Sequence, residues 1–332
     1  MKLDEMVKEL ERQKPLKWDR KVHSSIMEMV AVDNDVRFRI NGADPHPITR
    51  SCHAQIAERL DIPAKYYNRM ATEAPSLLTE NVNTWLERTG KELFVRRLDN
   101  SVRAVLSDRY RVIDHLDFLY SALNELQGHD VEIEACYLSE TEMNIKVKSN
   151  RLKDFIRDRG DMMIGGLLLT NSETGHKALR LEPRLYRVQC TNGMVLEQFT
   201  TRQVHLGNGN GNGHGNGELD EMIYLSIRRS IRELFGRFGE IIQALRDNTE
   251  IKVRNIQTVI NNLVEHYGLN ENQKANILMA FGAEPEHDKY GIANAVTRAA
   301  RMEDSWEGNL ELEKIGGRII ALTPDEFRVM DN

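Results

Sequence analysis

The chain has 332 residues, of which 40% are hydrophobic and 29% charged, a composition typical of globular proteins and long enough for one large or two ordinary domains. Its longest apolar run, Met162 to Leu169, is interrupted by glycine and is far shorter than the roughly 20 residues of a membrane-spanning helix. The first residues are charged throughout and lack the apolar centre of a signal peptide. We therefore expect a cytoplasmic protein without a membrane partner.

Most enzyme classes lack their usual motifs in this sequence. There is no phosphate-binding GxxxxGK[ST] loop, no GxGxxG and no HExxH. Cys52, Cys136 and Cys190 are widely spaced without a CxxC pair, which argues against disulfides and a structural zinc site. The acidic turn from Glu284 to Asp288 is either a weak metal site or a solvated turn, and we favour the turn. We expect no enzymatic activity, no metal and no cofactor.

The first half predicts short helices and antiparallel strands. Residues 55–70 suggest two short helices, interpreted as a packing module or as a DNA-reading helix-turn-helix; the packing module is favoured because the second helix carries few cations. Alternation over 93–98 and 102–106, with Asp99 and Asn100 between, predicts a β-hairpin whose exposed face is rich in arginine. An amphipathic helix follows Asp114, with Tyr120 on its apolar stripe. Further strands are predicted over 131–138, 143–147, 162–170 and 178–190.

The second half is predicted to be helical and to be joined to the first by a flexible segment. Residues 207–217 alternate glycine with asparagine or histidine and contain no apolar side chain, so they cannot enter a core. Apolar residues then recur every three or four positions over 219–245, which predicts one long amphipathic helix. Its stripe fits either an intrachain core or an oligomer seam. Asn270 and Gln273 form a capping-box pattern for a later helix.

The expected fold is therefore α+β, with an N-terminal antiparallel β-sheet domain with helices followed by an all-helical C-terminal region. We place the first domain at 1–206, the Gly/Asn linker at 207–217 and the helical domain at 218–332.

Cys190 and the residues after it allow two interpretations. A cysteine at the end of a strand can act as a nucleophile, but no histidine base can be assigned to it, and a buried structural cysteine is favoured. Asn192-Gly193 is interpreted as a tight turn that requires a positive φ.

Arginines, lysines and tyrosines concentrate on the predicted strands, and alternation puts many of them on a common face. Such a face combines phosphate pairing with base stacking, which suits sequence-tolerant binding of single-stranded DNA. An equally weighted alternative is that the cations pair with Glu132, Glu134 and Glu182 on neighbouring strands. The candidate nucleic-acid-binding residues are Arg96, Arg97, Arg103, Arg109, Tyr110, Arg111, Lys146, Lys148, Arg180, Arg184, Tyr186 and Arg187.

Three segments, 102–111 (VRAVLSDRYR), 186–193 (YRVQCTNG) and 294–298 (NAVTR), together resemble DUF932, a phage and plasmid family of unknown function. The resemblance runs from about Gln55 to the C-terminal helices, and the Gly/Asn run departs from it as an insertion. The order of hairpin, helix and further antiparallel strands is also similar to that of phage single-strand annealing recombinases. The first resemblance implies mobile-element biology; the second implies an oligomer that holds DNA along a basic groove without nucleotide hydrolysis.

We therefore expect a phage- or plasmid-encoded, ATP-independent DNA-binding protein of the annealing and recombination type, which forms a homo-oligomer and binds single-stranded DNA. The alternative is a structural or host-interaction protein of a mobile element with no nucleic-acid role, in which the arginines form salt bridges.

Overall fold

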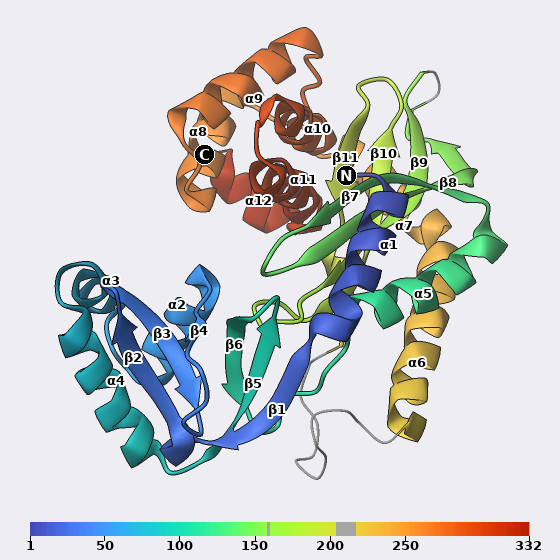
Figure 1. The fold of residues 1–332 in the computed structure, drawn as a ribbon. Helices are drawn as coiled ribbons and strands as arrows, with labels where there is room; N and C mark the ends of the chain where they lie inside the picture. Colours follow the sequence, from blue (N-terminus) through green and yellow to red (C-terminus); the bar gives the residue numbers. More distant parts are fainter. Residues whose placement is uncertain (158–159, 204–216, 332) are drawn as a thin grey trace.

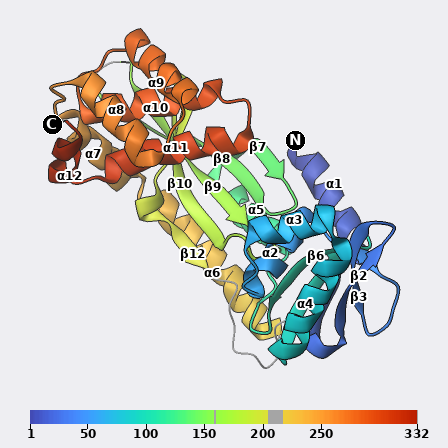
Figure 2. The same ribbon diagram turned by 90° about the vertical axis from the view of Figure 1, so that its left-hand side faces the viewer.

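The computed structural model describes residues 1–157, 160–203 and 217–331. The fold is α+β, with the antiparallel sheets first and a run of helices, α6 to α12, at the end, as the sequence predicts. The predicted linker at 207–217 lies outside the described residues except for Gly217, where α6 begins. Figures 1 and 2 show a lobe of β1–β6 at one end of the molecule, a large sheet in the middle and the last helices at the other end.

The N-terminal lobe contains two three-stranded antiparallel sheets, ordered β1-β5-β6 and β2-β3-β4. Their strands are β1 (Trp18–His23), β2 (Met27–Val32), β3 (Asp35–Ile40), β4 (His46–Pro47), β5 (Glu92–Leu98) and β6 (Ser101–Ser107). Three helices complete the lobe, α2 (Arg50–Arg59), α3 (Ala64–Glu73) and α4 (Pro75–Thr89). Helices α2 and α3 bury Cys52, Ile56 and Tyr67 in the core of this lobe. This packing agrees with the interpretation of residues 55–70 as a packing module.

The hairpin of β5 and β6 confirms the sequence prediction, including its turn. Asp99 and Asn100 have positive φ values of 46° and 67°. Positive φ at both central residues is what a two-residue hairpin turn that follows the twist of the strands requires.

The central sheet is antiparallel and ordered β11-β10-β9-β8-β7, with β12 also paired to β10. Its strands are β7 (Val131–Leu138), β8 (Met143–Phe155), β9 (Met162–Asn171), β10 (Leu179–Arg187), β11 (Asn192–Val195) and β12 (Thr201–Gln203). One apolar face packs against α1 (Leu3–Gln13), α5 (His115–Leu126) and α6 (Gly217–Gly236). Tyr120 was expected in the core, but it lies on the solvent side of α5.

The predicted long helix over 219–245 is two helices, because the chain turns at Arg237. Ile227, Ile231 and Leu234 of α6 pack on the sheet, so this part of the stripe forms an intrachain core. The remaining helices are α7 (Phe238–Thr249), α8 (Ile256–Tyr267), α9 (Glu271–Ala283), α10 (Lys289–Ala299), α11 (Trp306–Ala321) and α12 (Pro324–Met330). The predicted capping box of Asn270 and Gln273 is present at the start of α9.

The helices α7–α12 share one apolar core with residues at the ends of the sheet strands, including Met163, Leu185 and Met194. In the described part of the chain, no helix combines the length and the apolar character needed to cross a membrane.

Candidate nucleic-acid interface

Five of the predicted cations and aromatics do share one face of the central sheet. The register aligns Lys146 of β8 with Glu182 of β10 across Leu168, and Lys148 with Arg184 across Gly166. Alternation along β10 adds the positions of Arg180 and Tyr186 to this face. Arg187 has the opposite parity and points to the other side.

This face is not open, because α11 packs across it. Glu313 of α11 is buried and accepts hydrogen bonds from Lys146 Nζ at 3.0 Å and from Arg184 Nε and Nη2 at 3.0 and 2.8 Å. Lys146 Nζ also donates to Asn309 Oδ1 at 2.7 Å and lies 4.6 Å from the centre of the Trp306 ring. Both cations are thus engaged by groups of the C-terminal helices.

The electrostatics of this network follow from its burial. Burial lowers the pKa of Lys146, although Glu313 opposes this effect. Burial alone would raise the pKa of Glu313, but Arg184 and Lys146 lower it. A carboxylate between two buried cations therefore stays charged, and removing one member would leave an uncompensated charge in the interior.

The carboxylates of the alternative interpretation, Glu132, Glu134 and Glu182, all have cationic partners here, although Glu182 pairs within its own strand and with Lys314 of α11 and not with a neighbouring strand. Lys148 pairs with Glu132 at 3.0 Å, and Arg184 also pairs with Glu134. Arg180 lies between Glu182 at 3.9 Å and Glu197 at 3.8 Å. Lys148, Arg180 and Tyr186 keep partial exposure.

A hollow of about 400 Å³ opens beside this network. Buried Lys146, Arg184 and Glu313 are part of its lining, and exposed Arg301 also borders it. Its full lining is Glu134, Ala135, Lys146, Arg184, Tyr186, Thr191, Gly193, Arg301, Asn309 and Glu313.

Arg187 lies at the opposite side of the sheet, in a second ion-pair network. It pairs with Asp161 at 2.6 Å, with Glu284 at 2.6 Å and with Glu286 at 3.5 Å. The predicted solvated turn over 284–288 is therefore wrong: its carboxylates bind arginines that project from the tips of the β-hairpins. Arg157, near the tip of the β8–β9 hairpin, pairs in the same way with Glu286 and Asp288.

Cys190 is buried beside this network, as the structural interpretation predicts. Its Sγ donates to Glu284 Oε1 at 2.8 Å, and burial followed by this hydrogen bond raises the pKa of the thiol to about 11. A thiol of this kind is not activated for nucleophilic attack.

The Asn192-Gly193 turn was predicted wrongly. The residue with positive φ is Thr191, at 52°, whereas Asn192 and Gly193 begin β11. The segments 186–193 and 294–298 meet here, since Asn192 Nδ2 donates to Thr297 Oγ1.

The arginines of the N-terminal hairpin are mostly internal, so its face is not the exposed basic surface that was expected. Arg96 is fully buried and donates to Asp19 at 3.0 and 2.6 Å, to Asp114 at 2.9 Å and to the carbonyl of Glu173 at 2.8 Å. Arg103 is also buried and pairs with Glu173 at 2.7 Å. These residues join the N-terminal lobe to the loop after β9.

Tyr110 belongs to the same junction and is buried, with its hydroxyl donating to the carbonyl of Ser172 at 3.2 Å. Its ring therefore cannot stack on an external base without a rearrangement. Arg111 is half-buried, and Arg109 is exposed.

Arg97 is the exception among the arginines of β5, because it belongs to a surface patch of cations and an aromatic ring. Its guanidinium carbon lies 4.3 Å from the centre of the Trp18 ring, and that of exposed Arg20 lies 5.4 Å from the same centre. Arg97 also contacts His46, whose Nδ1 lies 3.1 Å from the carbonyl oxygen of Asn100. Burial, and then the charge of Arg20, lowers the pKa of Arg97. We call Trp18, Arg20 and Arg97 the Trp18 patch.

The carboxylates nearest to the Trp18 patch in sequence are already engaged elsewhere. Asp19 is bound by Arg96, and Asp99 is bound by Arg12 at 2.7 Å. Among the residues that the structure describes, neither Arg20 nor Arg97 forms an ion pair with a carboxylate. Trp18 and Arg20 are not among the residues predicted from sequence, because β1 was not predicted. The alternation of Trp18, Arg20 and Val22 was the available signal.

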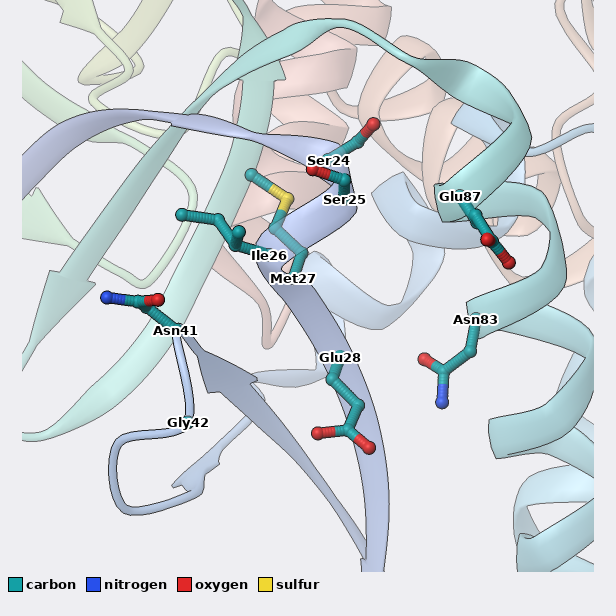
Figure 3. A pocket seen from close by; sticks show the side chains of 9 residues that line it. All are labelled: Ser24, Ser25, Ile26, Met27, Glu28, Asn41, Gly42, Asn83 and Glu87. Atoms are coloured by element: carbon teal, nitrogen blue, oxygen red, sulfur yellow. The ribbon is translucent and has the colours of Figure 1, made fainter.

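A further groove, of about 440 Å³, lies between β2 and the end of α4 and is shown in Figure 3. Glu28 and Glu87 are the charged residues that line it, together with serines, asparagines and apolar side chains. A groove with carboxylates and without a lysine or arginine does not suit the phosphates of a nucleic acid.

Within the described residues, no group of three or more histidine, cysteine or acidic side chains is arranged to hold a metal ion. Comparison with known proteins gives no match of this chain to a family model, to a curated protein or to a solved structure.

Proposed function

We propose that this protein binds single-stranded DNA without enzymatic activity, as an annealing or recombination factor of a phage or plasmid. The observation that carries the proposal is the Trp18 patch, in which two arginines without a described carboxylate partner flank an aromatic ring. Guanidinium groups pair with phosphates, and an indole ring stacks on an unpaired base. The resemblance of three segments to a mobile-element family supports the biological setting.

The location of the contact differs from the one expected from sequence. Arg96, Arg103, Arg184 and Arg187 are buried in ion pairs, and we assign them to structure. The DNA-binding role is kept for Arg97, with Trp18 and Arg20 added, and Arg109 is a further exposed candidate.

The second candidate function is a structural or host-interaction role without nucleic acid. It is favoured by the ion pairs of the central sheet, which engage the cations that suggested a DNA-binding face. The two candidates differ in one measurable property, the affinity for single-stranded DNA.

Substitution of Trp18 is the direct test of the proposal. Trp18→Leu keeps an apolar side chain against the core of the lobe but removes the stacking surface, whereas Trp18→Phe retains a ring. We expect Trp18→Leu to weaken binding of a single-stranded oligonucleotide by about 1–3 kcal/mol, and Trp18→Phe to weaken it less. Fluorescence anisotropy of a labelled oligonucleotide measures both.

Trp85, on α4 of the same lobe, supplies the matched control, because it is partly exposed and also lies beside an arginine, Arg88. Trp85→Leu should leave the affinity unchanged. Equal affinities for the parent and Trp18→Leu, or no binding by the parent, would contradict the proposal and favour the second candidate.

A further inference from the structure

The hollow beside Arg184 has the size and chemistry of a site for a small ligand. Its volume of about 400 Å³ lies within the range of about 300–1,000 Å³ that small-molecule sites occupy. Its lining contains Lys146, Arg184 and Glu313, which are almost fully buried and hold one another in place. These ion pairs fix the positions of two cations and one carboxylate in the lining of the hollow.

The remaining lining residues present three different kinds of contact. Arg301 is exposed, and its Nη1 donates a hydrogen bond to the carbonyl of Cys190 at 2.7 Å. Its other N–H groups remain available to bind an anion. Tyr186 is half-buried and lines the hollow, and Lys148 Nζ lies 4.6 Å from the centre of its ring. Glu134 is anchored by Arg184, and its side chain remains 29% exposed, so its carboxylate can accept further hydrogen bonds.

We propose that this hollow binds one nucleotide unit, as a mononucleotide or as one residue of a single strand. The guanidinium of Arg301 pairs with the phosphate, and the ring of Tyr186 stacks on the base. Glu134 accepts a hydrogen bond from an exocyclic amino group of the base. The site therefore favours cytosine, adenine or guanine, which carry an amino group, over thymine.

The segment 186–193 acquires a role under this proposal, because it supplies Tyr186, Thr191 and Gly193 to the lining. The proposal adds a base-recognition site to the proposed binding of single-stranded DNA and extends that function, but its test uses mononucleotides and is separate from the Trp18 patch.

Isothermal titration of the full chain with dCMP, dTMP and inorganic phosphate is the experiment. We expect dCMP to bind more tightly than dTMP, and phosphate alone to bind at least tenfold more weakly than dCMP. Arg301→Gln and Tyr186→Leu should each weaken dCMP binding about tenfold, and Tyr186→Phe should retain most of it. Arg328→Gln, at an exposed arginine of α12, should have no effect. Circular dichroism and thermal unfolding establish that each variant folds.

Absence of dCMP binding at millimolar concentration would overturn the inference, as would binding that is unchanged in both Arg301→Gln and Tyr186→Leu. Equal binding of phosphate and dCMP would also overturn it, because the base would then contribute nothing. If the parent protein binds oligonucleotides but not dCMP, this inference is wrong and the proposed function stands. If the parent protein binds dCMP but no oligonucleotide, the proposed function is wrong, and the hollow is a mononucleotide site.

Discussion

Gly193 of β11 lies directly against the guanidinium of Arg184 of β10, and a Cβ atom at position 193 would be 2.1 Å from Nη2 of Arg184. This distance is far below van der Waals contact, so only glycine leaves room for the arginine. Arg184 in turn holds Glu313 and Glu134. The glycine is thus explained by the neighbouring cation and not by a turn.

Gly193→Ala should therefore destabilise the protein. The methyl group would push Arg184 away from Glu313. Leaving one member of a buried ion pair without its partner costs about 3–5 kcal/mol of stability. Urea unfolding followed by circular dichroism measures the change. Gly239→Ala is the control, because a Cβ at position 239 of α7 meets nothing within 4 Å, and it should be neutral or slightly stabilising. Similar unfolding free energies for both variants would refute the proposed packing.

Acid sensitivity is expected from His115, which is buried at the start of α5. Burial lowers its pKa to about 4 in the folded state. The unfolded chain takes up the proton near 6.5, so stability is fully present above that pH and is lost as the pH falls towards 4. The free energy of unfolding should decrease by about 3 kcal/mol over this interval.

His115→Gln should reduce the part of the pH dependence between 6.5 and 4, because glutamine does not titrate. His266→Gln, at an exposed histidine of α8, serves as the control and should keep the parent curve. Denaturant unfolding at several pH values is the measurement. A parent curve that is flat over this interval would show that His115 accepts a proton in the folded state at no cost.

An annealing protein has to assemble, so the proposed function predicts a homo-oligomer. Met222 and Leu225 of α6 are 64% and 49% exposed, whereas Ile227 on the same helix is buried, so part of the apolar stripe is left at the surface. Multi-angle light scattering of the protein with and without a single-stranded oligonucleotide measures the mass. A monomer under both conditions would remove the annealing class from consideration while leaving DNA binding possible.

The sequence predicted the elements whose periodicity is strong and local. The strand over 131–138 matches β7, and the hairpin turn at Asp99 and Asn100 is correct. The N-terminal strands β1–β4 were not predicted. The pairing of β1 is long-range, since Trp18 aligns with Arg97. In contrast, β2 and β3 form a local hairpin around Asp33 and Asn34, which have positive φ, so a local signal was present for these two strands. The break at Arg237 was invisible, since the apolar period continues through it.

The candidate site was harder to predict than the fold. Alternation correctly grouped Lys146, Arg184 and Tyr186 on one face, but it could not show that Glu313 of α11 would cover them. Burial of a charged strand residue depends on a carboxylate far away in sequence, and a single sequence gives no signal for that pairing. Arg20 and Arg97 stand apart because the nearest carboxylates, Asp19 and Asp99, are bound by other arginines.

The salt dependence of the Trp18 patch provides a quantitative prediction. Each phosphate contact on a single strand contributes a slope of about −0.7 to the plot of log binding constant against log salt concentration. Replacing Arg20 by Glu and Arg97 by Gln should therefore make the slope shallower by about 1.4, twice the single-contact value. Parallel plots for the parent and the double variant would show that neither arginine contacts a phosphate.

The central claim is tested most directly by the affinity of this Arg20→Glu/Arg97→Gln variant for a single-stranded oligonucleotide at low salt. The matched control is Arg69→Glu, an exposed arginine on α3 of the same lobe. The account predicts that the parent and Arg69→Glu bind alike, and that the double variant binds at least tenfold more weakly while keeping its circular dichroism spectrum and melting temperature. A folded double variant that binds DNA as tightly as the parent would contradict the account.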